Sequence, residues 1–469
     1  MIINLGSQTI RMADAARILN GLYTGPEKSF KNICTDSREA DKDSLFVAIR
    51  GENVDGHNYI RNVIEAGCKC VLCEKLIPGC EDHSLVVPDS VEALSRLAHA
   101  HKNMCGFRTI GITGSVGKTT TKEFVYATLK NSFRTEKTEE NHNSVIGMPL
   151  DLLRMSPETE VAVLEMGMSA RGEISRLSAC AEPEIAMITN IGSSHVGMLG
   201  SRENIFQAKM EIVQGMLPGG HLVLNGDEPL FYDLKKSEYK PVYVGMDNKN
   251  SDIFAENIRY ELGHTTIDLN WMGTKVSDIR IPIMGAPGVY AAMYAFAAGY
   301  YMGLDSETIC AGVRQYASVG MRQHIEEEKG VTLIEDCYNA SPESMRAAMD
   351  ILNIVRGNHY KRRRIAVLGD MLELGRRSPE FHYDVGRYAA GCSDMLLTFG
   401  KEAEYIAEGA RSAGMAKEHV RVNNDQNDIE KTGRELISLL NPGDVVLFKA
   451  SRGIREERVI SYVKENYAV

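Results

Sequence analysis

The stretch RTIGITGSVGKTTT, residues 108–121, decides how the centre of this chain folds. Its first six residues, RTIGIT, are predicted to form a strand, and Lys118 is predicted to begin a helix. The turn between them carries Gly114 and Gly117, which let the backbone wrap closely around a ligand. Successive N–H groups and the helix N-terminus supply partial positive charge, so the stretch indicates a phosphate-binding loop.

The side chains after this turn suit a nucleoside triphosphate and a metal ion. Lys118 would reach the β- and γ-phosphates, and the Thr119 hydroxyl would bind Mg²⁺. The strict G-x-x-x-x-G-K-[ST] pattern wants glycine where this chain has Ile112. The alternative is a glycine-rich turn with a chance lysine, but GK followed by three threonines favours phosphate binding. The predicted nucleotide contacts are Thr113, Gly114, Ser115, Gly117, Lys118, Thr119 and Thr120.

Further strand-like segments, EVAVLEMG, EIAMITNIG and GHLVLNGD, alternate with helical ones, which predicts a doubly wound, mainly parallel sheet. Ligands of such sheets bind at the carboxyl ends of the strands. Glu165, His195, Asn225 and Asp227 follow these strands, so we expect them on the rim that holds the phosphate loop. Glu165 and His195 are candidate Mg²⁺ ligands, although each alone could be a capped strand end or a surface side chain.

Length and pattern changes predict three α/β domains. A chain of 469 residues corresponds to roughly three domains of about 150 residues. Residues 250–284 read as antiparallel strands inserted in the central domain, and a second α/β series begins near residue 318. The predicted domains are 1–86, 87–317 and 318–469, the last of them Rossmann-like.

Composition excludes several classes of protein. The hydrophobic fraction of 43% and charged fraction of 25% are those of a globular chain. A net charge of −10 disfavours general nucleic-acid binding. No apolar stretch reaches the roughly 18 residues of a membrane-spanning helix, and the first residues do not resemble a secretory signal. We therefore expect a cytoplasmic protein whose ten cysteines are reduced.

One cysteine cluster allows two interpretations. Cys68, Cys70, Cys73, Cys80 and His83 contain a C-x2-C and a C-x2-H pair, which resembles a small zinc knuckle. The alternative is that CKCVLC is a strand whose thiols serve as small apolar residues.

Lys209 stands out by its position in RENIFQAKMEIVQGM. On one continuous helix it would lie in the middle of an apolar arc formed by Ile205, Ile212, Val213 and Met216. A lysine there either extends its amine to the surface or is held inside, where desolvation lowers its pKa and makes the amine nucleophilic.

Together these motifs resemble the Mur ligase family, the ATP-dependent amide-bond ligases of peptidoglycan precursor synthesis. The T-G-S-x-G-K-T-T loop has the family's form, as do Asn141-His-Asn143, Glu165-Met-Gly167, Asn190-Ile-Gly192 and Asn225-Gly-Asp227. The resemblance implies that Glu165 and His195 bind Mg²⁺. It also implies that Lys209 is carbamylated and orients a magnesium ion.

Within the family, the chain most resembles the members that add D-alanyl-D-alanine to UDP-N-acetylmuramoyl-tripeptide. The segments LGDMLELG at 368–375 and EDCYNASP at 335–342 carry this resemblance. It implies that ATP and Mg²⁺ are used, that the first domain holds the UDP end of the precursor, that the third binds the dipeptide, and that the enzyme is a monomer. The implied contacts are Asn225, Arg322 and Asp336 for the nucleotide, and Ser37, Arg38, Asp55, Gly56, His57, Asn141, Asn143, Tyr338 and Asn339 for the substrates.

One segment departs from the family pattern. Where the family has G-x-H-N-V-x-N-A, this chain has Gly285-Ala-Pro287-Gly288-Val-Tyr-Ala291-Ala. The nucleobase must then be held by other groups, such as Asn225, Asp336 or backbone atoms. Two alternatives stay open: a ligase of the same architecture that adds a different amino acid or works on folate, and a non-catalytic nucleotide-binding relative.

Overall fold

The computed structural model describes residues 2–5, 9–51, 53–271, 273–357 and 362–468. Contacts divide the chain into two compact units. The first comprises residues 1–113, 130–186 and 210–221, and the second comprises 114–129, 187–209 and 222–469. The strands of the three larger sheets fall within the ranges 1–86, 87–317 and 318–469 respectively, although the domain limits themselves remain a prediction. In the described part of the chain, no helix combines the length and apolarity needed to cross a membrane.

The N-terminal sheet has five strands in the order β1-β4-β5-β6-β7. β1 is antiparallel to β4, and the remaining pairs are parallel. The strands are β1 (Ile2–Asn4), β4 (Asn32–Cys34), β5 (Ser44–Val47), β6 (Cys70–Cys73) and β7 (Ser84–Val86). The other elements here are β2 (Ile10–Arg11), β3 (Ser29–Phe30), α1 (Met12–Leu19), η1 (Gly56–Tyr59), α2 (Ile60–Glu65) and η2 (Glu81–His83).

The cysteines of this region are core residues. Cys68, Cys73 and Cys80 pack in one apolar cluster with Phe46 and Val71. Burial raises the pKa of the Cys70 thiol to about 12, which keeps it protonated. Over the described residues, no group of three or more His, Cys, Asp or Glu side chains is arranged to hold a metal ion. The structure thus supports the strand interpretation of CKCVLC and not the zinc knuckle.

The helix predicted near Ser90 is confirmed as α3 (Ser90–Cys105). Its first turn is capped by Asp89, whose carboxylate accepts hydrogen bonds from the backbone N–H groups of Val91 and Glu92. Gly106 ends the helix in the left-handed conformation, with φ of 77°.

The central sheet has nine strands in the order β16-β15-β14-β13-β12-β11-β8-β10-β9. The strands are β8 (Arg108–Thr113), β9 (Thr135–Lys137), β10 (Val161–Glu165), β11 (Ile185–Ile188), β12 (His221–Asn225), β13 (Val242–Gly245), β14 (Ile253–Glu261), β15 (His264–Trp271) and β16 (Thr274–Ile281). β14, β15 and β16 pair antiparallel, as expected for 250–284, while β14 pairs parallel with β13. The inserted strands therefore extend the central sheet.

The central helices follow the predicted alternation. They are α4 (Lys118–Leu129), α5 (Gly147–Arg154), α6 (Glu173–Ala181), α7 (Val196–Leu199), α8 (Arg202–Met210), η3 (Glu211–Gly215), η4 (Pro229–Lys236), α9 (Ala286–Tyr301) and α10 (Ser306–Val313). β8 leads through the glycine-rich turn into α4, so the strand–loop–helix prediction is confirmed. The prediction of one continuous helix from residue 202 to 216 is wrong, because α8 ends at Met210 and a 3₁₀ segment follows.

The C-terminal sheet has six strands in the order β17-β18-β22-β19-β20-β21. The strands are β17 (His324–Glu328), β18 (Val331–Glu335), β19 (Arg364–Gly369), β20 (Met395–Phe399), β21 (Val420–Asn423) and β22 (Val445–Lys449). The helices are α11 (Pro342–Arg356), η5 (Gly375–Arg377), α12 (Ser378–Cys392), α13 (Glu404–Ser412), η6 (Lys417–His419), α14 (Ile429–Leu439), η7 (Arg452–Ile454) and α15 (Glu457–Asn466).

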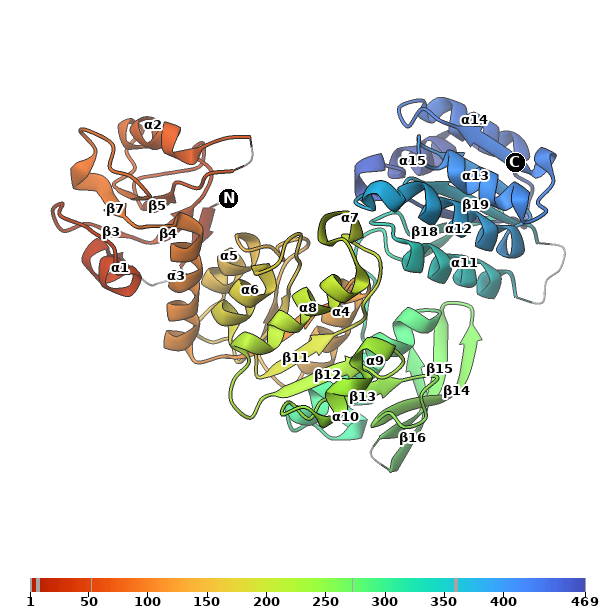
Figure 1. Cartoon of the computed structure of the whole chain (residues 1–469), viewed down its shortest axis with the longest axis horizontal. Coiled ribbons are helices and arrows are strands. Elements are labelled where there is room, and N and C mark those ends of the chain that lie inside the picture. Colours follow the sequence, from red (N-terminus) through yellow and green to blue (C-terminus); the bar gives the residue numbers. More distant parts are fainter. Residues whose placement is uncertain (1, 6–8, 52, 272, 358–361, 469) are drawn as a thin grey trace. The chain divides into compact units, whose positions relative to one another are not determined.

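Helices cover both faces of this sheet (Figure 1). Ile365 and Val367 of β19 pack in the core that includes Leu436 of α14 and Val463 of α15. Residues between them point to the opposite face, where α11 packs against α12. Strands β18 to β22 are parallel, and β17 joins the edge antiparallel. This is the arrangement expected for the Rossmann-like domain predicted at 318–469.

Candidate active site

The phosphate loop in the second unit requires both of its glycines. Gly114 has φ of 150° and Gly117 has φ of 82°, conformations that L side chains rarely adopt. A Cβ atom on Gly114 would lie 1.8 Å from Oγ1 of Thr189, so no side chain fits there. The ammonium group of Lys118, the first residue of α4, donates to the Gly114 carbonyl at 2.9 Å. The loop thus places Lys118 at a helix start, as the motif predicts.

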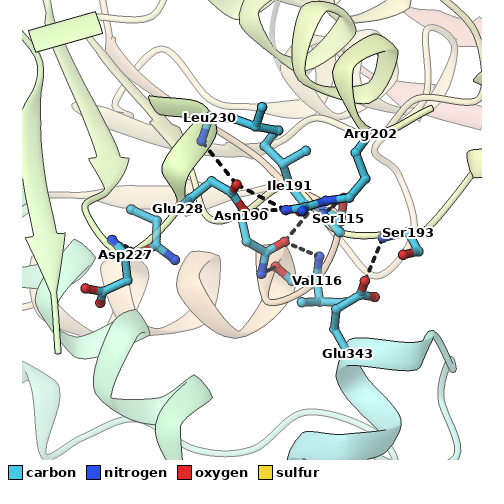
Figure 2. A network of polar contacts seen from close by, with 12 residues as sticks. Ser115, Val116, Asn190, Ile191, Ser193, Arg202, Asp227, Glu228, Leu230 and Glu343 are labelled. Carbon is cyan, nitrogen blue, oxygen red and sulfur yellow. Dashed lines mark hydrogen bonds and ion pairs between the residues drawn. The ribbon is translucent and has the colours of Figure 1, made fainter. Parts of the chain in front are cut away.

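The segment after β11 holds this loop in place, as Figure 2 shows. The Asn190 side-chain oxygen accepts hydrogen bonds from the backbone N–H groups of Ser115, at 3.1 Å, and Val116, at 3.0 Å. The Gly192 N–H donates to the Ser115 hydroxyl at 2.9 Å, and the Thr189 hydroxyl donates to the Val116 carbonyl at 2.6 Å. Amide groups that a phosphate would use are therefore paired with an amide oxygen in this state.

An ion pair between the exposed Arg202 and the buried Glu228 connects the same segment to the end of β12. Arg202 donates to the Ile191 carbonyl at 2.7 Å and to the Glu228 carboxylate at 2.8 Å (Figure 2). Glu228 also caps η4, because its carboxylate accepts from the Leu230 N–H. Sequence reasoning missed Arg202 and Glu228, since nothing in their local pattern distinguishes them from a surface ion pair.

Lys209 is held inside the protein. Its side chain is 2% exposed, which is not compatible with an amine that reaches solvent. Burial lowers its pKa well below the ordinary lysine value, and the positive charge of Lys118 lowers it further. A neutral amine is the form that reacts with carbon dioxide, so the environment of Lys209 suits carbamylation.

Glu165 lies at the end of β10 in the first unit. It stands in register with Ile112 on the neighbouring β8, shortly before the phosphate loop begins. Its carboxylate is 3% exposed and accepts a hydrogen bond from the Asn143 amide at 2.9 Å. Asn143 packs so closely against Gly167 that a Cβ there would lie 2.8 Å from it. The structure therefore brings Asn143 and Glu165 together, while Asn141 is exposed.

His195 is held in the left-handed conformation, with φ of 65°, just before α7. Its Nδ1 atom lies 2.7 Å from Oε2 of Glu373, although the two are not aligned for an ideal hydrogen bond. His195 lowers the pKa of the Glu373 carboxyl, and Lys118 adds to this effect. Sequence reasoning singled out the segment 368–375 but not Glu373 itself, and the contact with His195 is long-range.

Asp370, from the same segment, has an internal role. Its carboxylate accepts a hydrogen bond from the Ala403 N–H at 2.6 Å, and burial raises the pKa of its carboxyl group. The buried His382 accepts a hydrogen bond at Nε2 from the Met371 N–H, and burial lowers the pKa of its imidazole. Both side chains thus fix the backbone that carries Glu373.

The altered segment 285–291 begins α9. Pro287 lies in the first turn of the helix, where its missing N–H costs nothing. A Cβ on Gly288 would lie 2.4 Å from the Ile283 side chain, so glycine permits close packing. Tyr290 donates to the Asp227 carboxylate at 2.6 Å. The pattern analysis missed Tyr290, which contributes the polar group of this segment that bonds to Asp227.

Asn225, a predicted nucleotide contact, has partners inside the protein. Its amide nitrogen donates to the Thr189 carbonyl at 3.3 Å, and its oxygen accepts from the Asp227 N–H at 2.9 Å. Asp227 in turn accepts from the backbone N–H groups of Met246 and Asn248, each at 2.6 Å. These residues shape the rim after β12, and their binding to a nucleotide remains a prediction.

The predicted C-terminal contacts surround the end of β18. The Arg322 guanidinium lies 3.8 Å above the ring of Tyr338, a cation–π arrangement. Asp336 accepts a hydrogen bond from the buried Lys449 ammonium at 2.7 Å. Asn339 is exposed, and its carbonyl also accepts from Lys449. Arg322 and Tyr338 thus form one polar surface on this region.

The predicted precursor contacts of the N-terminal region divide into two kinds. Arg38 is exposed and forms an ion pair with Asp36, and it follows Ser37 in the loop after β4. His57 is buried, with Nδ1 2.6 Å from Asp55 and Nε2 accepting from the Glu74 N–H. Asp55 also caps the short helix that begins at Gly56. We infer that His57 fixes this loop, while Arg38 remains accessible to a ligand.

The donor set suits Mg²⁺. The Thr119 hydroxyl and the Glu165 carboxylate are hard oxygen donors and both are buried. Mg²⁺ usually takes only one or two carboxylates together with water and phosphate oxygens. A dedicated cage of three or more His, Cys, Asp or Glu is not needed for it, and none occurs over the described residues. Each of these donors therefore has the chemistry that Mg²⁺ prefers, and magnesium binding remains a prediction.

A phosphate loop at the carboxyl end of a parallel sheet, with a buried lysine in the same unit, defines a P-loop enzyme that acts on a nucleotide. The chain belongs to the Mur ligase family, the ATP-dependent ligases that form C–N bonds. The Mur ligase middle domain matches residues 112–299, the glutamate ligase domain of Mur ligases matches 321–452, and the catalytic domain of the Mur ligase family matches 29–102.

Individual relatives match almost the whole chain. The UDP-N-acetylmuramoyl-tripeptide–D-alanyl-D-alanine ligase of Bacillus subtilis is 38% identical, over 96% of this chain and 97% of the relative. The crystal structure of MurF from Acinetobacter baumannii has a TM-score of 0.90 and 30% identity, covering 98% and 99% of the two chains. MurF from Thermotoga maritima, in complex with ADP, has a TM-score of 0.82 and 29% identity, covering 93% and 97%. The predicted family and fold class are confirmed.

Proposed function

We propose that this chain adds D-alanyl-D-alanine to UDP-N-acetylmuramoyl-tripeptide, with ATP as the energy source, in peptidoglycan precursor synthesis. The observation that carries the proposal is the 38% identity, over 96% of the chain, to the Bacillus subtilis ligase that bears this activity in its name. The phosphate loop and the buried Lys209 support it, since both belong to the machinery of phosphoryl transfer in such a ligase.

The first step activates the tripeptide. A carboxylate oxygen of the tripeptide attacks the γ-phosphorus of ATP, the bond to the β,γ-bridging oxygen breaks, and ADP leaves. Lys118 and the loop N–H groups stabilise the charge that develops on the transferred phosphoryl group. Arg322, stacked on Tyr338, is the proposed additional cation for the phosphates. The product is an acyl phosphate.

The second step forms the amide bond. The free amine of D-alanyl-D-alanine attacks the acyl carbon, and the amine loses its proton. The resulting tetrahedral intermediate expels phosphate when the bond between carbon and the phosphate oxygen breaks. An acyl phosphate hydrolyses readily, so the site must exclude water while the dipeptide binds.

Magnesium would be held by Thr119, Glu165, His195 and, once carbamylated, Lys209. When bound, it supplies positive charge to the phosphate oxygens. The protein's own part is to keep these donors in place. Asn143 orients Glu165, Glu373 lies against His195, and burial lowers the pKa of Lys209, which favours its neutral amine.

The substrates are assigned to separate regions. We assign the UDP end of the precursor to the loops that carry Ser37, Arg38 and Asp55–His57, and the dipeptide to the region of Tyr338 and Asn339. ATP and a UDP-linked precursor are cytoplasmic compounds, which places the proposed reaction in the cytoplasm. A monomer is the expected active form.

A ligation assay tests the proposal. ATP, Mg²⁺ and UDP-N-acetylmuramoyl-tripeptide are incubated with and without D-alanyl-D-alanine, using lysine and diaminopimelate forms of the tripeptide in parallel. We expect ADP release and a pentapeptide product only when the dipeptide is present. ADP release when a folate and glutamate replace the tripeptide and the dipeptide would favour the folate-type ligase. Absence of turnover with every acceptor would favour a non-catalytic protein.

A further inference from the structure

The segment between β11 and α7 is contacted from two directions. On one side it carries the phosphate loop, through Asn190 and Gly192. On the other side it meets two carboxylates from the region after β18. The Ser193 N–H donates to Oε1 of Glu343 at 2.8 Å (Figure 2). Nδ1 of His195 lies 2.7 Å from Oε2 of Glu373. Neither Glu343 nor Glu373 has a role in the mechanism above that touches a reacting atom.

Glycines show that these contacts are closely fitted. A Cβ on Gly192 would lie 2.9 Å from Cδ of Glu343, and its three nearest neighbours are all atoms of that side chain. A Cβ on Gly197 would lie 2.6 Å from the backbone nitrogen of Gly375, and one on Gly375 would lie 2.6 Å from Cα of Gly197. The Gly197 N–H also donates to the Glu373 carbonyl. Both contacts, at Gly192 and between Gly197 and Gly375, therefore require glycine.

We propose that Glu343 is a positioning residue for phosphoryl transfer, because it fixes residues 190–193 and through them the phosphate loop. The chain of contacts has few steps. Glu343 holds the Ser193 N–H, the adjacent Gly192 N–H holds the Ser115 hydroxyl, and Asn190 holds the N–H groups of Ser115 and Val116. The expected effect on kcat rests on the proposed function. The hydrogen bond between Ser193 and Glu343 is independent of it.

The second carboxylate oxygen of Glu343 is buried at a cost in free energy. Oε2 is buried and has no hydrogen-bond partner among the described residues. Burying an unpaired carboxylate oxygen is unfavourable, so the side chain is retained here against a desolvation cost. A glutamine at this position would still accept the Ser193 hydrogen bond, without placing a charge there.

The kinetic test separates binding from transfer. Glu343→Ala removes a hydrogen bond to a charged group, so we expect kcat for ligation to fall about 10-fold. The KM for ATP should stay within about 2-fold, since Glu343 does not touch the nucleotide-binding atoms. Glu343→Gln should retain most of the wild-type kcat. The matched control is Glu408→Gln, an exposed carboxylate on α13, which should leave kcat unchanged.

A double-mutant cycle tests the contact itself. Gly192→Ala should lower kcat to a similar extent, because its methyl group displaces the Glu343 side chain. In the Glu343→Ala background the same substitution should cost nothing further, since the clashing atoms are gone. Additive losses, or a Glu343→Ala enzyme with wild-type kcat, would overturn the inference. Thermal unfolding of each variant shows whether a loss of activity reflects a loss of fold.

Hydrogen exchange provides a readout that does not need turnover. The Ser193 amide should exchange faster in Glu343→Ala than in the wild type, and at the wild-type rate in Glu343→Gln and Glu408→Gln. Equal exchange in all four proteins would reject the contact. If the wild type does not ligate D-alanyl-D-alanine but the exchange difference is present, the proposed function fails while the positioning contact stands.

Discussion

The phosphate loop and the start of α9 differ in the groups that they offer to a ligand. The loop presents backbone N–H groups, so its geometry depends on Gly114 and Gly117 and tolerates Ile112 in place of a motif glycine. The family pattern at 285–291 relies instead on side chains, and here Pro287 and Gly288 occupy those positions. Recognition by backbone tolerates side-chain changes away from Gly114 and Gly117, whereas recognition by side chains is lost when those side chains are replaced.

The polar groups at the phosphate loop and at the start of α9 also have different hydrogen-bond partners. Around the phosphate loop, Asn190 occupies N–H groups that a phosphate could take over. At the start of α9, Tyr290 and Asp227 bind each other and the backbone of residues 246–248. We therefore expect nucleotide affinity to come chiefly from the triphosphate end, and the following experiments test this difference.

The largest effect is expected for Lys118→Ala. The ammonium group offsets phosphate charge in the transfer step, so kcat should fall at least 100-fold, a barrier increase of about 2.7 kcal/mol. Steady-state ligation kinetics give the value, with the exposed Lys236→Ala as control. A Lys118→Ala enzyme that keeps more than about a tenth of wild-type kcat would contradict the phosphate-loop assignment.

A somewhat smaller loss is expected for Lys209→Ala. Burial lowers the pKa of this amine and so favours its neutral form, and carbamylation would convert it to an anion close in charge to a carboxylate. We expect kcat to fall about 30-fold, with partial recovery when short-chain carboxylic acids occupy the vacated position. Lys209→Met, which fills the space, should not be rescued. Unmodified lysine density at position 209 in a well-ordered crystal structure at neutral pH, with no rescue of Lys209→Ala, would reject carbamylation.

The sequence predicts those parts of the site whose interactions are between residues close together along the chain. β8, its turn and α4 are local features, and the glycines and Lys118 identify them. The burial of Lys209 was one of two open interpretations, because periodicity cannot decide between a core and a surface amine and α8 ends one residue later. Glu343, Glu373 and Arg202 act through partners far along the chain, and no local pattern reports such contacts.

Edge strands illustrate the same limit in the fold. β17 carries Glu326, Glu327 and Glu328 in succession, a polar pattern that does not indicate a strand. It forms because its backbone pairs antiparallel with the buried β18, and because Lys464 forms an ion pair with Glu326. The buried strands β18 and β22 are mostly apolar, with Glu335 and Lys449 only at their ends, and such a pattern predicts a strand.

We expect weak discrimination between nucleobases, because the polar side chains predicted to hold the base already have partners in the protein. The amide of Asn225 already bonds to Thr189 and Asp227, and Asp336 already pairs with Lys449. We expect kcat/KM for GTP to lie within about 100-fold of that for ATP, because discrimination depends on polar groups that the wrong base leaves unpaired. A preference for ATP beyond about 10⁴ in parallel ligation assays would reveal a complete base-reading site.

The smallest effect is expected for Tyr290→Phe, which separates a structural from a binding role at the start of α9. Burial raises the pKa of Tyr290, so its hydroxyl remains a donor to Asp227. Asp227 keeps its backbone partners when this hydroxyl is removed, so the free energy of unfolding should fall by only about 1 kcal/mol. The KM for ATP should change less than about 3-fold. Tyr232→Phe, at an exposed position, is the matched control. A tenfold rise in KM at unchanged thermal stability would instead make Tyr290 a nucleotide ligand and remove the contrast between the two ends.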